Sequence, residues 1–160
     1  PRYAYGITAG ADYKGFDFEM FWQGIGKRDY FGGWGGAQFW GFTDEWCTAQ
    51  TNSLDYWTED NRDAYFPKLH HYSVNGSNHN TSSRYMLNAA YLRLKNVTLG
   101  YTVPSSLLKK VGIARLRVFV QGENLLTLTP MKVKFADPDT LGDMTYPINK
   151  KISVGMNLTL

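Results

Sequence analysis

The stretch KISVGMNLTL, residues 151–160, alternates strictly between apolar and polar side chains. Apolar residues occupy every second position, and Ser, Gly, Asn and Thr fill the positions between them. A period of two is the signature of a β-strand with two different faces. The run is longer than the roughly 5–6 residues usual in soluble proteins, and it reaches the roughly 9–11 residues of a tilted membrane strand.

Four further segments carry the same period, at residues 2–11, 15–25, 89–103 and 114–127. With residues 151–160 they predict five antiparallel strands, each with an apolar face and a polar face. The apolar positions, expected to face lipid, are Phe16, Phe18, Met20, Trp22, Val97, Leu99, Tyr101, Leu116, Val118, Val120, Ile152, Val154, Met156 and Leu158. The polar positions, expected to line a wet interior, are Asp17, Glu19, Gln23, Arg117, Gln121 and Glu123.

The alternation within residues 89–103 reverses its phase near Lys95 and Asn96. A β-bulge there would insert one extra residue and return the following side chains to their proper faces. The other interpretation is that the strand leaves the membrane at this point, so that Arg93 and Lys95 project outward above the apolar band.

The connections between the predicted strands alternate in length. A tight turn at residues 12–14 and a short link at 104–112 alternate with long loops at 26–88 and 128–150. Short turns at one end and long loops at the other are typical of bacterial outer-membrane barrels. The predicted fold is therefore all-β, a section of a transmembrane barrel with long extracellular loops.

The composition excludes several other classes of protein. No apolar run approaches the roughly 20 residues of a membrane helix. The net charge of +3 comes from 17 basic and 14 acidic residues spread along the chain, which does not favour nucleic-acid binding. Cys47 is the single cysteine, so the chain forms no internal disulfide and no cysteine-based metal site.

The chain offers no catalytic motif, and we expect no enzyme activity, cofactor or metal. His70 and His71 are neighbours in a long loop, where solvated histidines are more common than metal ligands. Aromatic residues make up 16% of the chain. Those in residues 26–88 either contact a sugar, a peptide or a partner protein, or pack the loop onto itself; the candidates are Trp34, Trp40, Trp46, Tyr56 and Trp57.

Three stretches resemble the SusC/RagA-type TonB-dependent outer-membrane transporters. YLRLKNVTLGYTVP at residues 91–104 resembles their third-last strand, and LRVFVQGENLLT at 116–127 resembles their penultimate strand. Residues 137–139, 146–147 and 155–160 resemble their final loop and closing strand. The similarity extends over nearly the whole chain in order, although barrels of this kind usually end in an aromatic residue and this sequence ends in Leu160.

This resemblance implies a parent barrel of about 22 strands, of which residues 1–160 would be the C-terminal section. Five strands cannot close such a barrel, and open strand edges are not tolerated in lipid. The resemblance further implies a plug domain and a TonB-engaging segment outside this chain, and contact with the plug is then the alternative role of the polar positions. It also implies a SusD-like lipoprotein as lid and import of a large glycan or peptide. A soluble carbohydrate-binding β-sandwich and a secreted glycan-degrading enzyme are the alternatives; the sandwich would bury the apolar side chains between two sheets.

Overall fold

The protein is described by a computed structural model, which covers residues 1–35, 37–40, 51–69, 79–109, 112–134, 136–141 and 148–160. The chain divides into two compact units. The sheet unit comprises Pro1–Arg28, Ala90–Pro130 and Ile148–Leu160, and the loop unit comprises Asp29–Ala89 and Met131–Pro147. Among the described residues, no helix is both long and apolar enough to cross a membrane.

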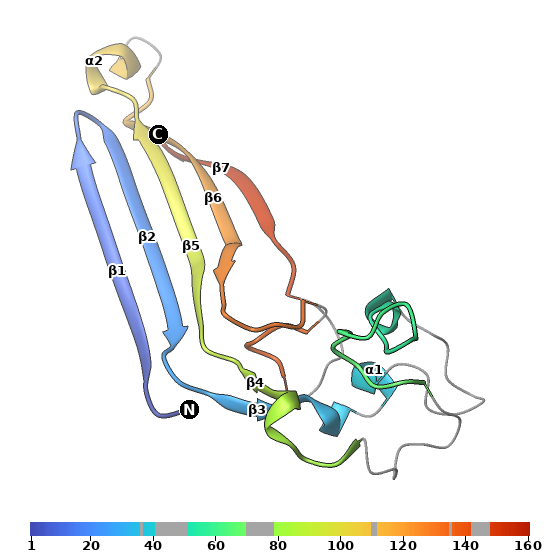
Figure 1. The fold of residues 1–160 in the computed structure, drawn as a ribbon. Helices are drawn as coiled ribbons and strands as arrows, with labels where there is room; N and C mark the ends of the chain where they lie inside the picture. The colour runs from blue at the N-terminus through green and yellow to red at the C-terminus, as the bar shows by residue number, and fades with distance from the viewer. Residues whose placement is uncertain (36, 41–50, 70–78, 110–111, 135, 142–147) are drawn as a thin grey trace. The chain divides into compact units, whose positions relative to one another are not determined.

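The sheet unit is a single sheet of five strands in the order β1-β2-β5-β6-β7, with antiparallel neighbours throughout (Figure 1). The predicted fold class of five antiparallel strands is confirmed. The strands are β1 Ala4–Tyr13, β2 Phe16–Ile25, β5 Tyr91–Thr102, β6 Arg115–Leu128 and β7 Lys151–Thr159.

The turn between β1 and β2 lies at Lys14 and Gly15, later than the expected residues 12–14. Both turn residues have positive φ, 47° at Lys14 and 89° at Gly15. Two positive-φ residues make the type of two-residue turn whose twist matches antiparallel strands, and glycine adopts this conformation without steric cost. The backbone oxygen of Gly15 also accepts a 2.7 Å hydrogen bond from the Thr102 amide, which ties the turn to β5.

A bulge in β5 explains the reversed phase of its sequence. Register with β2 pairs Phe21 with Asn96 and then Trp22 with Leu94, so Lys95 is the extra residue. Register with β6 shifts at the same place, between Leu94 and Asn96. Leu94 therefore shares the apolar face with Trp22, whereas Arg93 pairs with Gln23 on the polar face; of the two interpretations, the bulge is the one observed.

Asn124 occupies the matching irregularity in β6 with a φ of 53°. Asparagine tolerates this left-handed conformation far better than a β-branched residue does. We therefore expect Asn124→Val to destabilise the protein by about 1–2 kcal/mol, whereas Asn124→Gly leaves stability nearly unchanged. Urea unfolding of the full-length protein measures the difference, and equal stability of the two variants would contradict the role of the left-handed residue.

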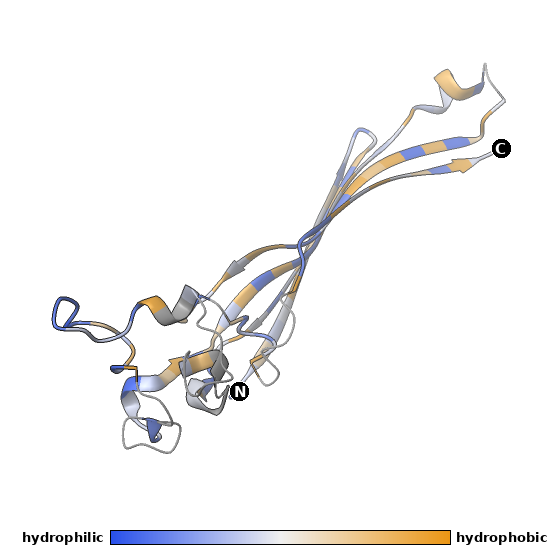
Figure 2. Ribbon diagram, turned by 90° about the vertical axis from the view of Figure 1, so that its right-hand side faces the viewer, coloured by the Kyte–Doolittle hydropathy of each residue, from blue (hydrophilic) through white to orange (hydrophobic). Residues whose placement is uncertain are grey.

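Hydrophobic and hydrophilic residues alternate along the long strands (Figure 2). Directly opposed residues of an antiparallel pair lie on the same face, so the register defines the two faces. Phe18, Leu99, Val120 and Val154 form one row across the sheet on its apolar face. The next row on that face joins Phe16 to Tyr101, whose rings lie 4.6 Å apart, and continues to Val118 and Met156.

The loop unit has a hydrophobic core of its own. Its short elements among the described residues are β3 Asp29–Phe31, η1 Gly32–Gly35, α1 Ala37–Trp40, η2 Thr51–Leu54, η5 Ser83–Tyr85 and β4 Met86–Asn88; β3 and β4 pair antiparallel. The helix α2 Ser105–Leu108 belongs to the sheet unit. The described core residues of the loop unit are Phe31, Phe39, Trp40, Phe66, Tyr85, Leu87, Ala89, Met131, Val133 and Leu141. Residues from both predicted loops therefore fold together into one cluster.

Candidate functional site

The polar face of the sheet brings together the side chains predicted to face an interior. Asp17, Glu19 and Gln23 alternate along β2, and Arg117, Gln121 and Glu123 lie two strands away on β6. The register through β5 places all six on the same face, opposite the apolar rows. This face is therefore mainly polar and spans the neighbouring strands, although Phe21 and Phe119 also lie on it.

An ion pair crosses β5 near the end of the sheet that carries the tight turn. Arg117 binds Asp17 through two of its nitrogens, and its Nε donates to Asp17 Oδ1 at 2.9 Å. The two side chains meet above Gly100, because Gly100 is the β5 residue opposite Asp17. A Cβ atom at Gly100 would lie 2.5 Å from both Asp17 carboxylate oxygens and 2.6 Å from Arg117 Nη2. Glycine at this position is what allows the ion pair to span three strands.

A polar hollow lies further along the same face. Glu19, Thr98 and Gln121 stand in one row across β2, β5 and β6, with Asn96 in the next row. They line a cavity of about 340 Å³ together with Thr8, Met20 and Phe21. Carboxylate, amide and hydroxyl groups in one hollow can donate and accept hydrogen bonds.

The other polar candidates continue this surface toward the end of the sheet that carries the long loops. Gln23 lies opposite Arg93, whose Nε donates to Thr127 Oγ1 at 2.9 Å. Arg93 is only 1% exposed, and its guanidinium lies 5.6 Å from the centre of the Tyr91 ring. Glu123 lies opposite Lys151, with 4.0 Å between the carboxylate and the ammonium group.

The loop aromatics predicted as contact residues have different environments. Trp40 is 3% exposed, stacks on His79 with 4.2 Å between ring centres, and donates from Nε1 to the Gly33 oxygen. Trp40 therefore packs the loop onto itself, the second of the two interpretations given for these aromatic residues. Tyr56 packs against the same core. The side chain of Trp34 and all of Trp46 lie outside the described residues, as do His70 and His71.

Trp57 lies beside a pocket of the loop unit. It is half-buried and lines a pocket of about 430 Å³. Three basic residues, Arg62, Lys68 and Arg84, line the same pocket. Arg84 is held in place by hydrogen bonds from its guanidinium to the backbone oxygens of residues 64 and 65.

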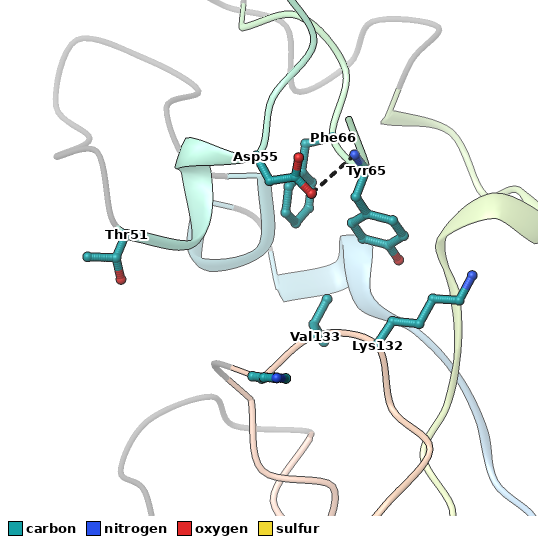
Figure 3. A pocket seen from close by; sticks show the side chains of 7 residues that line it. Thr51, Asp55, Tyr65, Phe66, Lys132 and Val133 are labelled. Carbon is teal, nitrogen blue, oxygen red and sulfur yellow. Dashed lines mark hydrogen bonds between the residues drawn. The ribbon is translucent and has the colours of Figure 1, made fainter. Parts of the chain in front are cut away.

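A larger pocket of about 590 Å³ lies in the loop unit (Figure 3). Two segments far apart in the sequence form it, since Asp55 and Tyr65 meet Lys132 and Lys134 there. Asp55 accepts hydrogen bonds from the Tyr65 amide at 3.3 Å and from Asn61 Nδ2 at 3.4 Å. The rest of the lining is Thr51, Phe66 and Val133.

The environment of Tyr65 in this pocket changes the acidity of its phenol. Burial raises the pKa of the Tyr65 phenol, the nearby Tyr85 raises it further, and the charge of Arg84 lowers it in part. The phenol therefore stays protonated well beyond neutral pH and remains a hydrogen-bond donor. Its oxygen is buried and has no hydrogen-bond partner within the described part of the chain, a state that costs about 1–3 kcal/mol.

Sequence reasoning did not identify Gly100, Tyr65, Lys132 or Lys134 as site residues. A signal for the lysines is present in the stretch MKVK at residues 131–134, where apolar and basic residues alternate as in a strand with one buried face. Gly100 offered a weaker signal, a glycine at a polar-face position inside a strand, which often marks a close approach. Tyr65 offered none.

Among the described residues, no group of three or more His, Cys, Asp or Glu side chains could hold a metal ion.

No family model matches the sequence. Two curated relatives from Formosa agariphila are similar to it. The TonB-dependent receptor P3 is 48% identical over 48 residues, which cover 30% of this chain and 5% of the relative. The TonB-dependent receptor P26 is 25% identical over 99% of this chain and 17% of the relative.

Solved structures of the RagAB peptide importer are similar to nearly the whole chain in both fold and sequence. The open-open state superposes with a TM-score of 0.69 and 27% identity, over 98% of this chain and 17% of that one. The closed-closed state gives 0.68 and 28%, over 97% of this chain. The chain is a section of a SusC/RagA-type TonB-dependent transporter.

This section spans less than a fifth of the solved chains and of the P26 receptor, as the coverage of 17% shows. Its five strands form part of a barrel wall, and the barrel is not closed within them. The proteins that the chain resembles are receptors and transporters rather than enzymes, in agreement with the prediction of no enzyme activity.

Proposed function

We propose that this section of the transporter forms wall and outer loops in the bacterial outer membrane. In this proposal the barrel imports a large nutrient, an oligosaccharide or a peptide, using energy delivered through TonB. The polar face of the sheet, with Asp17, Glu19, Gln23, Arg117, Gln121 and Glu123, lines the lumen or contacts the plug. Substrate crosses without covalent change.

The exposed apolar face of the sheet carries the proposal. Val154 is 79% exposed, Met156 73% and Ile152 71%, although all three belong to a regular strand. A water-soluble domain would bury such a face, since each large apolar side chain gains about 1.5–3 kcal/mol from burial. Lipid contact accounts for the exposure. The alternative β-sandwich would have buried these side chains between two sheets.

The loop unit supports the proposed partner, a SusD-like lipoprotein that caps the barrel. Ten of the described residues form its core, so these loops hold a defined shape in place of an open coil. A shaped loop surface suits both docking of a lid and capture of substrate. The RagAB structures belong to a peptide importer, which makes peptides one of the two substrate classes to test.

Cysteine labelling tests which face meets lipid. The full-length transporter first receives Cys47→Ser, since Cys47 is the single cysteine of this section. Val154→Cys and Ser153→Cys then place thiols on opposite faces of β7. We expect a lipid-soluble maleimide to label Val154→Cys in outer membranes, and a membrane-impermeant reagent to label only Ser153→Cys. Labelling of Val154→Cys by the impermeant reagent would contradict the assignment.

Uptake measurements test the transport activity itself. Cells that depend on the full-length transporter receive fluorescent oligosaccharides or peptides, with and without a protonophore. We expect accumulation that stops with the protonophore and that weakens when the neighbouring lipoprotein is deleted. Accumulation that is unaffected by the protonophore would exclude the TonB-dependent mechanism.

A further inference from the structure

We propose that the pocket formed by Asp55, Tyr65, Lys132 and Lys134 binds a carboxylate group of the transported nutrient. This inference rests on the proposed function, because it makes the loop unit a first contact for an acidic glycan or an acidic peptide. The ligand chemistry is the same in both cases, a carboxylate joined to a short polymer.

Burial of the neighbouring residues leaves the two lysine side chains exposed. Met131 and Val133 are buried in the core of the loop unit, and the alternation of the extended chain turns Lys132 and Lys134 to the opposite, exposed side. Both lysines line the pocket. Within the part of the chain that the structure describes, neither lysine has an ion-pair partner.

The acidic residue of the pocket does not neutralise these lysines. Each carboxylate oxygen of Asp55 accepts a hydrogen bond, Oδ1 from Asn61 and Oδ2 from the Tyr65 amide. These bonds fix the segment around residue 55 against the segment around residue 65, as the parallel bridge between Tyr56 and Phe66 also does. Asp55 therefore shapes the pocket, and the two lysines outnumber it in charge.

Tyr65 supplies a neutral donor beside the lysines. Figure 3 shows its phenol directed toward the segment that carries Lys132 and Val133. The hydroxyl has no acceptor within the described residues, so a ligand oxygen that reaches it gains a hydrogen bond that the empty pocket lacks. Two ammonium groups and one hydroxyl together match the acceptor-only chemistry of a carboxylate.

The size of the pocket and its surroundings favour an oligomer over an isolated ion. A volume of about 590 Å³ accommodates a small organic molecule and greatly exceeds one carboxylate. Phe66 lines both this pocket and the pocket of Trp57, where Arg62 and Lys68 add further positive charge. The loop unit therefore carries further basic residues in a second pocket that shares Phe66 with the first.

Calorimetry on the full-length transporter in detergent tests the proposal with four probes. These are tetragalacturonic acid, its methyl ester, tetraglutamate and tetraglutamine. We expect the acid of at least one pair to bind and its neutral analogue to bind at least about tenfold more weakly, with binding that weakens as salt is raised toward about 1 M. Binding of tetragalacturonic acid indicates an acidic glycan as the source of the carboxylate, and binding of tetraglutamate indicates an acidic peptide.

Variants connect that binding to the pocket. Lys132→Gln with Lys134→Gln is expected to weaken binding of the acid about tenfold or more, and Tyr65→Phe roughly fivefold. The matched control is Lys27→Gln with Lys109→Gln, which removes the same charge from exposed positions of the sheet unit. The control is expected to bind like the wild type.

Four outcomes would overturn the proposal. The first is equal binding of acid and neutral analogue, and the second is equal loss in the control and pocket variants. The third is that neither acid binds while the pocket variant weakens the complex with the lid lipoprotein, which would assign the lysines to the lid. The fourth separates this inference from the proposed function. Energy-dependent uptake of a neutral nutrient, with no binding of either acid, would leave the proposed function standing while excluding this inference.

Discussion

Val120→Arg is expected to destabilise the membrane-inserted transporter by about 2–4 kcal/mol. Val120 lies on the apolar face in the middle of β6, between Leu99 on β5 and Val154 on β7. It is 47% exposed in this section, so the new side chain has no protein core to disturb. The cost arises because lipid offers the guanidinium neither water nor a counter-ion at that depth.

The matched control is Gln121→Arg, one residue along the same strand and on the opposite face. If the polar face meets water, an arginine there changes stability by less than about 0.5 kcal/mol. The measurement is urea unfolding of the full-length transporter in lipid vesicles, followed by the heat-dependent mobility of the folded barrel on gels. Equal effects of the two substitutions would show that the two faces do not differ in environment.

The sheet could be predicted from the sequence because one physical rule governs it. Side chains of a strand alternate between faces, so residues such as Phe18 and Val154 reveal their side through their neighbours alone. The phase reversal near Lys95 was open to two interpretations, because a bulge and a strand that leaves the membrane produce the same pattern in a single strand. Pairing with β2 and β6 settles it, because partners such as Trp22 and Leu126 are visible only in three dimensions.

The loop unit could not be predicted in the same way. Its core joins Phe39 and Phe66 to Val133, residues far apart in the sequence and without a common period. Aromatic residues there suit both packing and ligand contact, and Trp40 proves to be packed. The pocket depends on the same long-range association, because Lys132 becomes part of a site only when it meets Tyr65.

Gly100→Val is expected to destabilise the barrel by about 1–3 kcal/mol, the usual range for overfilling a packed position. The position is buried beneath the bridge between Asp17 and Arg117, which leaves no space for a Cβ atom. A valine must therefore separate the ion pair or push β5 away from its neighbours. Thr98→Val, two residues along the same face of β5, is the control, since valine has nearly the shape of threonine and Thr98 already fits there.

A second set of variants separates the clash from the general cost of changing a glycine. In a background of Asp17→Ser with Arg117→Ser the bridge is absent, so adding Gly100→Val is expected to cost much less than it does in the wild type. This non-additivity in urea unfolding is the signature of direct contact. The same loss in both backgrounds would mean that Gly100 serves the strand for another reason and that the bridge does not require a glycine beneath it.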